Sequence, residues 1–282
     1  MSVAPRAFVV GWPIAHSRSP LIHGTWLDNL GLAGSYEKLA IEPDAFPAFV
    51  QTLRENGFVG GNVTIPHKAV AASLCTELTP TARRLGVANT LWFENGRLCG
   101  DTTDGAGFLG ALDQDAPGWD RRRALAIVLG AGGASRAIVD ALLQRGFARI
   151  IVANRSVERA DLLLRQLRDS RCEAASFDAA EHATSRADLL VNTTSAGMHG
   201  QAELAFDIAA LPDHAVVNDI VYVPRRTALL RRAEACGLRT VGGLGMLLHQ
   251  AVPGFARWFG VRPAVTPELR AIVEADIEAA QA

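Results

Sequence analysis

The chain has 282 residues, 49% of them hydrophobic, and a formal net charge of −1, so it offers no basic surface of the kind that holds nucleic acid. Its length favours two ordinary domains with well-filled cores. The four cysteines are scattered without a CxxC pair, and we see neither a signal peptide nor an apolar run of ~20 residues, which together predict a cytoplasmic protein with no metal site and no membrane span.

The N-terminal part of the chain alternates strand-like and helix-like segments. Residues 7–10 predict a short buried strand, and Ser19-Pro20 predicts the start of a helix that runs to about Leu30 and stops at Gly31. Further strands are expected at residues 36–41 and 58–65, and further helices at 43–56 and 66–74. This alternation predicts the α/β class.

The second half of the chain repeats the alternation after a polar, turn-rich segment at 114–119, which we interpret as a surface segment near a domain junction. Strands are expected at 124–129, 149–153, 188–192, 215–220 and 239–241. A helix follows the glycine turn after residue 129 and ends at Gly146, and a last helix starts at Thr266-Pro267-Glu268 and runs to the end of the chain.

The glycine turn Gly130-Ala131-Gly132-Gly133-Ala134 lies between a predicted strand and a predicted helix. This layout is typical of dinucleotide sites, because the glycines let the main chain approach a pyrophosphate while the helix N-terminus presents free N–H groups to it. Ser135 stands where the third glycine of the common GxGxxG pattern would fall, so the motif alone is weak and the strand-to-helix context carries the prediction.

The end of the following strand indicates which nucleotide binds. NAD sites usually place an acid there, whereas this chain places Asn154-Arg155-Ser156, with Arg159 one turn later. Two guanidiniums and a serine suit a 2′-phosphate, because they offer it charge-assisted hydrogen bonds. The sequence therefore favours NADP, although Arg155 in an arginine-rich chain could also serve only to cap a loop.

A second set of polar residues predicts a site for a small acid. Ser17 and Ser19 lie just before a helix, where two hydroxyls beside unpaired N–H groups suit a carboxylate. The alternative is that Ser19 is only an N-cap. Asn62 and Thr64 alternate with apolar residues and so share one face of a strand.

Lys68 closes the run Asn62-Val63-Thr64-Ile65-Pro66-His67-Lys68, and the chain has only one other lysine, Lys38. A lysine can exchange a proton where an arginine cannot, so Lys68 is a candidate for chemistry, near the third position of its helix. Lysine scarcity could instead reflect codon usage. Asp104 is the expected partner of Lys68, although it could be an N-cap and nothing more.

Together these segments resemble shikimate dehydrogenase, a family of NADP-dependent oxidoreductases that act on a CH–OH group. The resemblance extends over nearly the whole chain, and its motifs occur in family order. The matching motifs are Gly11-Trp12-Pro13 with His16-Ser17-Arg18-Ser19-Pro20, residues 62–68, Ala88-Asn89-Thr90, Thr103-Asp104-Gly105, residues 130–134, Asn154-Arg155, residues 192–198, and residues 243–247 with Gln250-Ala251.

The resemblance implies reversible reduction of 3-dehydroshikimate to shikimate, a step of aromatic amino-acid biosynthesis. Its implied fold is an α/β substrate domain at 1–105, a Rossmann NADP-binding domain at 106–242, and C-terminal helices at 243–282 that return to the first domain, with the cleft between the two domains. The implied catalytic pair is Lys68 and Asp104.

The resemblance also implies binding residues. The substrate carboxylate would be held by Ser17 and Ser19, with Tyr222 nearby, and its ring hydroxyls by Asn62, Thr64, Asn89, Asp104 and Gln250. The cofactor would contact Gly130, Ala131, Gly132, Gly133, Ala134, Asn154, Arg155, Arg159, Thr193, Met198, Ile220, Gly243 and Met246.

The chain departs from the family pattern at Gly24, where asparagine is frequent, and at Thr102, where the family often has Asn-Thr-Asp-Gly. These departures bear on substrate preference, so a quinate/shikimate dehydrogenase that uses NAD and an aminoshikimate-type paralogue stay open. So do a non-catalytic NADP-responsive regulator and a methylene-tetrahydrofolate dehydrogenase-like enzyme, although the latter leaves the paired serines unexplained. The expected partner is a small molecule. The sequence leaves the choice between monomer and homodimer open.

Overall fold

The computed structural model describes residues 4–280, and the chain divides into two compact units. Unit 1 takes in the residues up to Thr103 and those from Gln250 onward, and unit 2 runs from Asp104 to His249. Each unit is built on one six-stranded sheet. The α/β class predicted from the sequence is therefore confirmed. Within residues 4–280, no helix is long and apolar enough to cross a membrane.

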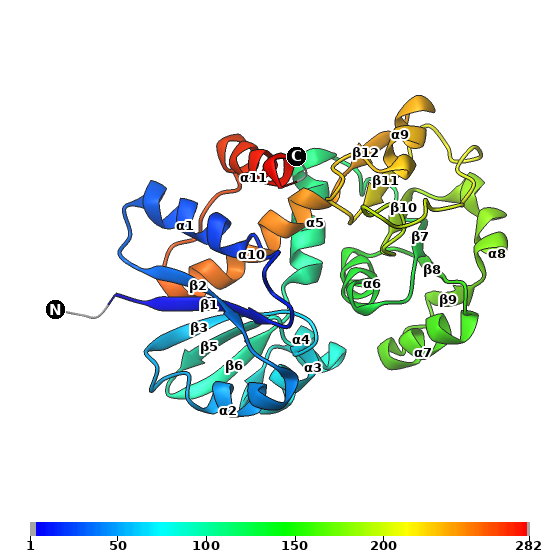
Figure 1. Ribbon diagram of the computed structural model, residues 1–282. Helices are drawn as coiled ribbons and strands as arrows, with labels where there is room; N and C mark the ends of the chain where they lie inside the picture. The colour runs from blue at the N-terminus through cyan, green and yellow to red at the C-terminus, as the bar shows by residue number, and fades with distance from the viewer. Residues whose placement is uncertain (1–3, 281–282) are drawn as a thin grey trace. The chain divides into compact units, whose positions relative to one another are not determined.

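Unit 1 contains a mixed sheet in the order β2-β1-β3-β5-β6-β4 (Figure 1). Its strands are β1 (Arg6–Gly11), β2 (Ser35–Ala40), β3 (Phe58–Val63), β4 (Glu77–Leu78), β5 (Thr90–Glu94) and β6 (Arg97–Asp101). Its helices are α1 (Ser19–Leu30), a 3-10 turn at Pro43–Ala45, α2 (Phe46–Gln51), α3 (Lys68–Leu74), α4 (Pro80–Leu85) and α11 (Pro267–Ala279). Strand β1 pairs in parallel with both β2 and β3, whereas β5 runs antiparallel to β3 and β6.

Both faces of β1 are buried, because side chains alternate along a strand and each face meets apolar partners. Phe8 and Val10 belong to a cluster with residues of α2 and α3, whereas Ala7 and Val9 belong to a cluster with Trp258. Strand β1 is therefore a central strand that reads as a continuous apolar run.

Unit 2 contains an all-parallel sheet in the order β12-β11-β10-β7-β8-β9. Its strands are β7 (Leu125–Leu129), β8 (Arg149–Ala153), β9 (Cys172–Ala175), β10 (Leu189–Asn192), β11 (Val216–Asp219) and β12 (Arg239–Val241). Its helices are α5 (Asp104–Asp115), α6 (Gly133–Arg145), α7 (Val157–Leu167), α8 (Phe177–Glu181), a 3-10 turn at Thr184–Arg186 and α9 (Ala228–Ala235). Helix α10 (Gly243–Phe259) begins in unit 2, and the division between the units falls within it.

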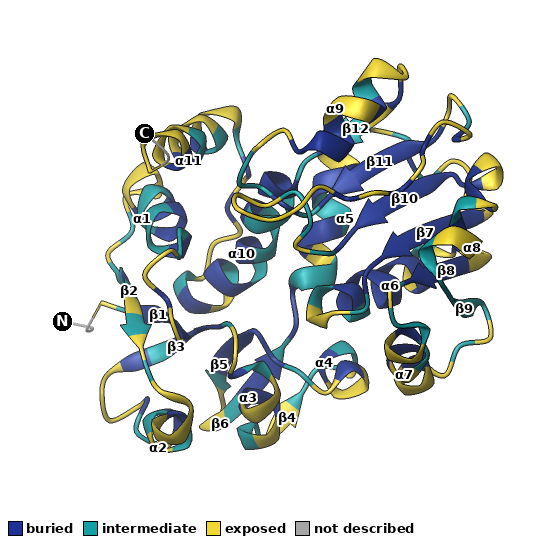
Figure 2. Ribbon diagram, turned by 45° about the vertical axis from the view of Figure 1, so that its right-hand side comes forward, coloured by how far each residue is buried: buried dark blue, intermediate teal, exposed yellow. Residues whose placement is uncertain are grey.

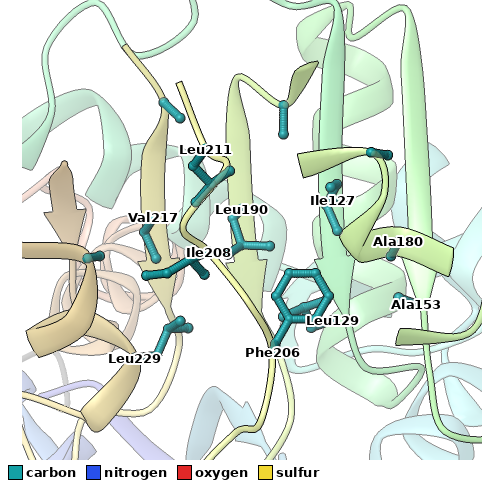
Figure 3. Packing of buried hydrophobic residues seen from close by; sticks show 14 of the residues in the cluster. Ile127, Leu129, Ala153, Ala180, Leu190, Phe206, Ile208, Leu211, Val217 and Leu229 are labelled. Atoms are coloured by element: carbon teal, nitrogen blue, oxygen red, sulfur yellow. The ribbon is translucent and has the colours of Figure 1, made fainter. Parts of the chain in front are cut away.

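The strand order of unit 2 is that of a doubly wound dinucleotide-binding sheet, in which successive strands are added on one side of β7 up to β9 and on its other side from β10 onward, so that the strand order reverses between β7 and β10. Figure 2 shows its central strands as buried. On one face, Ile127, Leu129, Leu190 and Val217 pack against the ring of Phe206 and the side chains around it (Figure 3). Ligands of such sheets bind beyond the carboxyl ends of the strands at the reversal point.

Several predicted boundaries are confirmed and three are wrong. Helix α1 ends at Gly31 and α6 at Gly146, both in the left-handed conformation, as expected. The helix expected at 43–56 ends at Gln51, and the strand expected to reach residue 65 ends at Val63. Lys68 is the first residue of α3 and not near its third position.

His23, on α1, is fully buried in the aromatic cluster of unit 1. Its ring stacks on Tyr36, with centroids 4.0 Å apart, and on Phe255 at 5.8 Å. Burial lowers the pKa of His23 from 6.5 to about 3, against a smaller opposing effect of the Asn62 side chain. The folded protein therefore keeps this imidazole neutral at pH values well above its pKa of about 3.

Gly130, directly after β7, has a φ of +108°, which few residues other than glycine adopt. A Cβ placed there would lie 2.7 Å from Thr193 Oγ1 and 2.9 Å from Thr194 Cγ2. Both the backbone conformation and the close approach of the segment after β10 therefore require glycine at this turn.

We predict that the acid sensitivity of unit 1 depends on His23. As the pH falls from 6.5 towards 3, the unfolded chain protonates this residue and the folded one does not, so folding stability falls. The folded chain binds about one proton fewer than the unfolded chain there, so the loss is on the order of 1 kcal/mol per pH unit. The free energy of unfolding is measured in urea at a series of pH values. His23→Phe should reduce its fall at acid pH, and replacement of the exposed His182 by Gln should leave that fall unchanged. Parallel curves for the wild type and His23→Phe would contradict the prediction.

We also predict that Gly130→Ala destabilises the protein by about 1–3 kcal/mol, because alanine there is strained in φ and collides with the segment after β10. Gly132→Ala is the matched control, since a Cβ at Gly132 would meet no atom within 4 Å. Its effect on the free energy of unfolding should stay within about 0.5 kcal/mol. Denaturant unfolding of both variants measures the difference, and equal stabilities would refute the role of Gly130.

Candidate functional site

The residues predicted to bind a small acid divide between the two units. Asp104 and Tyr222 belong to unit 2. The others belong to unit 1 and are Ser17, Ser19, Asn62, Thr64, Lys68, Asn89 and Gln250. In unit 1, Ser17 follows β1 and Lys68 follows β3. Because β1 and β3 are parallel neighbours, the segments that follow them start at one edge of the sheet.

At the start of α1, Ser17 and Ser19 have different roles. The backbone N–H of Ser19 donates to Ser17 Oγ at 3.3 Å, and Ser19 is the first helical residue, so it is not the N-cap. Arg18 Nε lies 3.0 Å from Asp276 Oδ2 of α11, so its guanidinium is engaged with that helix. The two hydroxyls therefore lie at the positive end of α1, where a carboxylate is favoured.

The position of Lys68 is fixed by its neighbour His67. His67 Nε2 bonds Ile41 O at 2.8 Å, and its ring stacks on Phe46 with centroids 4.3 Å apart. Burial lowers the pKa of His67, against a smaller raising effect of the bond to Ile41, so it favours a neutral structural role. The carbonyl of Lys68 accepts from Ala88 N at 2.9 Å. The main chain that carries the ammonium is thus held by two other segments.

A chain of buried hydrogen bonds runs beneath this edge of the sheet. Tyr36 Oη donates to Asn62 Oδ1 at 2.7 Å, and Asn62 Nδ2 donates to Asn89 O at 3.1 Å and to Thr90 Oγ1 at 3.2 Å. Thr90 Oγ1 donates in turn to Asn89 Oδ1 at 2.9 Å, which also accepts from Thr103 N at 2.9 Å. The Asn62 side chain is therefore directed into the protein.

The same chain of bonds reaches the C-terminal segment of unit 1. Thr103 Oγ1 donates to Gln250 O at 2.8 Å, and Asp104 is the next residue after Thr103 and opens α5. Thr64 lies just past β3, half-buried, with its N–H donating to Val10 O at 2.9 Å. Ile65, the last residue of the strand expected at 58–65, is 64% exposed, because β3 has already ended.

Unit 2 contains a pocket of about 530 Å³ at the carboxyl ends of β7, β8 and β10. Its walls include residues 130–132 after β7, Asn154 and Arg155 after β8, Arg159 of α7, and residues 193–196 after β10. The pocket therefore lies at the point where the strand order reverses, which is the position that dinucleotides occupy in such sheets.

Ser135 stabilises the glycine turn of this pocket. Its hydroxyl accepts from Gly132 N at 3.0 Å and lies 2.6 Å from Thr193 Oγ1. Because the Thr193 hydroxyl donates its hydrogen to Leu129 O at 2.7 Å, the Ser135 hydroxyl must be the donor to Thr193. The serine in place of the third glycine thus links the turn after β7 to the segment after β10.

The two residues directly after β8 are Asn154 and Arg155, and neither is an acid. Arg155 and Arg159 line the pocket and are exposed, so their guanidiniums are accessible to an anion. Ser156, expected to assist them, instead donates to Glu158 Oε2 at 2.8 Å and is not part of the pocket wall. The carboxylate on the wall, Glu203, lies 3.7 Å from Arg231. The residues present therefore fit a nucleotide with a 2′-phosphate.

The remaining residues expected at the cofactor lie outside this pocket. They are Gly133, Ala134, Met198, Ile220, Gly243 and Met246. Gly133 and Ala134 open α6 directly behind the glycine turn. Gly243 and Ile220 are brought together, since a Cβ at Gly243 would lie 2.0 Å from Ile220 O. Met198 is exposed and Met246 half-buried.

Two structural residues escaped the sequence analysis. Asp219, at the end of β11, is fully buried and accepts from Asn192 Nδ2, Val221 N and Thr227 Oγ1 at 2.7–3.0 Å. Burial raises the pKa of its carboxyl, and these three bonds oppose the rise. The second of these residues is Tyr36, which donates to Asn62. An acid at the end of a predicted strand was a usable signal for Asp219, whereas nothing local singled out Tyr36.

No group of three or more histidine, cysteine or acidic side chains within residues 4–280 is arranged to hold a metal ion.

Three models of known protein families match successive parts of the chain. Residues 9–91 match the shikimate dehydrogenase substrate binding domain, residues 114–222 match shikimate / quinate 5-dehydrogenase, and residues 243–270 match the shikimate 5′-dehydrogenase C-terminal domain. The curated shikimate dehydrogenase (NADP(+)) of Methylocella silvestris is 58% identical to the chain over 99% of both proteins.

Solved structures agree with this match. The shikimate 5-dehydrogenase of Thermus thermophilus, solved with NADP(H) and shikimate, is 34% identical with a TM-score of 0.84, over 98% of this chain and 99% of that one. The quinate dehydrogenase of Corynebacterium glutamicum, solved with NAD, is 27% identical with a TM-score of 0.89, over 96% of this chain and 99% of that one. The two-sheet fold, the pocket at the strand reversal and these full-length similarities show that the chain belongs to the shikimate dehydrogenase family.

Proposed function

We propose that this protein is an NADP-dependent shikimate dehydrogenase that catalyses the reversible reduction of 3-dehydroshikimate to shikimate. The observation that carries the proposal is the 58% identity, over 99% of both chains, to a curated NADP-dependent shikimate dehydrogenase. The test is to mix the protein with shikimate and NADP and to measure the formation of NADPH as a rise in absorbance at 340 nm. Absence of turnover with this pair would reject it.

Unit 2 is the proposed NADP-binding domain and unit 1 the proposed substrate domain. Two features of the pocket support NADP over NAD. Asn154 stands where an acid would repel a 2′-phosphate, and Arg155 and Arg159 supply two positive charges on the pocket wall. The glycine turn and the N-terminus of α6 would hold the pyrophosphate.

Bound NADPH would supply the hydride, and the protein would manage the charge and the proton at the substrate oxygen. As the ketone is reduced, its oxygen gains negative charge, which the Lys68 ammonium is proposed to stabilise and to neutralise by donating a proton. Asp104 is proposed to orient the ammonium and a substrate hydroxyl. Because the main chain that carries Lys68 is already held in place, it does not have to reorganise during the reaction.

Ser17 and Ser19, at the positive end of α1, are proposed to hold the substrate carboxylate, with Tyr222 as a further contact. Thr64, Asn89 and Gln250 are proposed to hold the ring hydroxyls. Such a site rejects analogues that lack a hydroxyl, because its own buried polar groups would be left unpaired. Asn62 was expected among these residues, but its side chain is engaged with Tyr36, Asn89 and Thr90.

Quinate is the second candidate substrate, since the chain resembles a solved quinate dehydrogenase over nearly its full length. A panel of shikimate, quinate and an amino analogue, each with NADP and with NAD, separates the two activities. We further propose a cytoplasmic location, because all four cysteines are unpaired, as in a reducing compartment.

We predict that Lys68→Ala lowers kcat for shikimate oxidation about 10²-fold or more, because it removes the proton donor and the charge at the substrate oxygen. The KM for NADP should change little, since Lys68 belongs to unit 1. Lys38→Arg is the control: it removes the only other lysine but keeps a donor for Ala15 O, which Lys38 Nζ contacts at 2.7 Å. Steady-state kinetics of both variants decide, and near-normal turnover of Lys68→Ala would refute the assignment.

We predict that Arg155→Gln and Arg159→Gln each raise the KM for NADP by about tenfold or more, the cost of losing a hydrogen bond to a charged group. The KM for NAD should stay within about twofold, because NAD lacks the 2′-phosphate. Arg165→Gln, on helix α7 with Arg159 and paired with Asp161, should alter neither value. An equal loss for both nucleotides would show that the two arginines serve the fold and not the phosphate.

A further inference from the structure

The side-chain amide of Asn62 is engaged inside unit 1. Asn62 is 5% exposed, its Nδ2 group donates to Asn89 O and Thr90 Oγ1, and its Oδ1 accepts from Tyr36 Oη. An amide carries two N–H donors, so both of its hydrogens have protein acceptors. Asn62 cannot donate a hydrogen bond to a substrate without giving up one of these bonds.

Tyr36 sets the orientation of that amide. Its hydroxyl has one hydrogen, which it donates to Asn62 Oδ1 at 2.7 Å. Tyr36 is 9% exposed and its ring stacks on His23 with centroids 4.0 Å apart, so packing holds the phenol in place. Burial raises the pKa of Tyr36 well above its usual value, against lowering effects of Ser19 and Asn62. The phenol therefore stays a neutral donor.

The bonds beyond Asn62 lead to residues of the proposed substrate site. Thr90, 1% exposed, accepts from Asn62 Nδ2 and donates to Asn89 Oδ1. Asn89 Oδ1 also accepts from Thr103 N, and Thr103 Oγ1 donates to Gln250 O. With its Oδ1 committed to these donors, the Asn89 side chain has one orientation, which fixes where its Nδ2 group lies.

We propose that Tyr36 and Asn62 are positioning residues: through Thr90 they orient Asn89 and Thr103, and so set the affinity of the site for the hydroxylated substrate. This inference rests on the proposed function, because Asn89 is taken there as a contact of the ring hydroxyls. It assigns Asn62 to the support of the site and not to its surface. A donor chain of this kind is rigid because each member has a single satisfied arrangement.

The central test is Tyr36→Phe, which removes only the hydroxyl. The Asn62 amide loses its fixed donor, and Asn89 gains freedom to turn. The KM for shikimate should rise by about 5–50-fold, the range that corresponds to a buried acceptor left without its hydrogen bond. The kcat at saturating shikimate should stay within about threefold of the wild type, because Lys68 is untouched, and the KM for NADP should not change.

Two further variants separate positioning from simple stability. Trp258→Phe removes another buried bond of the same aromatic cluster, from Trp258 Nε1 to Leu91 O at 2.8 Å. It should lower the melting temperature without raising the KM for shikimate. Thr90→Val breaks the bond chain at its middle with little change of shape, and it should reproduce the Tyr36→Phe phenotype. It also serves as the test if Tyr36→Phe does not fold.

A double-mutant cycle between Tyr36→Phe and Asn89→Ala completes the design. If Tyr36 acts through Asn89, the increase in KM of the double variant is smaller than the product of the single increases. Independent, multiplying effects overturn the inference, and so does a normal KM in Tyr36→Phe and Thr90→Val. Failure of the wild type to oxidise shikimate at all would instead reject the proposed function, and the inference with it, so the wild-type assay comes first.

Discussion

A buried side-chain amide must find acceptors for two hydrogens and a donor for its oxygen, and in unit 1 this requirement joins segments that lie far apart in the chain. Asn62 meets it with Tyr36 of β2, with Asn89, the residue before β5, and with Thr90, the first residue of β5. Each bond costs stability if it is broken, because the orphaned group cannot reach water. The edge of the sheet that carries Ser17 and Lys68 is therefore held by a network with one satisfied arrangement.

In unit 2, backbone geometry holds together two segments that are far apart in the chain. The positive φ of Gly130 and the bonds of Ser135 to Gly132 and Thr193 bring the glycine turn against the segment after β10. That architecture serves any dinucleotide, since the helix N-terminus and the turn recognise only the pyrophosphate. We propose that the choice between nucleotides depends instead on Arg155 and Arg159 at the end of β8, so that different residues determine the fold and the cofactor preference.

In unit 1, several buried ionisable groups are kept neutral. The buried titratable groups His23, His67 and Tyr36 are held in their neutral forms by desolvation, and they orient other residues. Lys68 and Asp104, the proposed catalytic pair, are half-buried, and Arg155 and Arg159 are exposed.

The sequence by itself determined what depends on local pattern. Apolar runs, a proline near the start of α1, and glycines after α1 and α6 predicted the α/β class and the ends of these helices, because each rests on neighbouring residues alone. The spacing of Lys68, the glycine turn and Arg155 indicated the chemistry. Where a pattern was weak, as in the helix expected at 43–56, local propensity overestimated the length of the element.

Only the tertiary structure decided the partners of the polar side chains. Asn62 looked like a residue of the site surface and turned out to be directed inward, Ser156 is engaged with Glu158, and Ser135 proved to be a link between two segments. Tyr36 had no local signal at all. The physical reason is that a hydrogen bond between Tyr36 and Asn62, or between Ser135 and Thr193, depends on strand order and register, which place together residues that no window of the sequence contains.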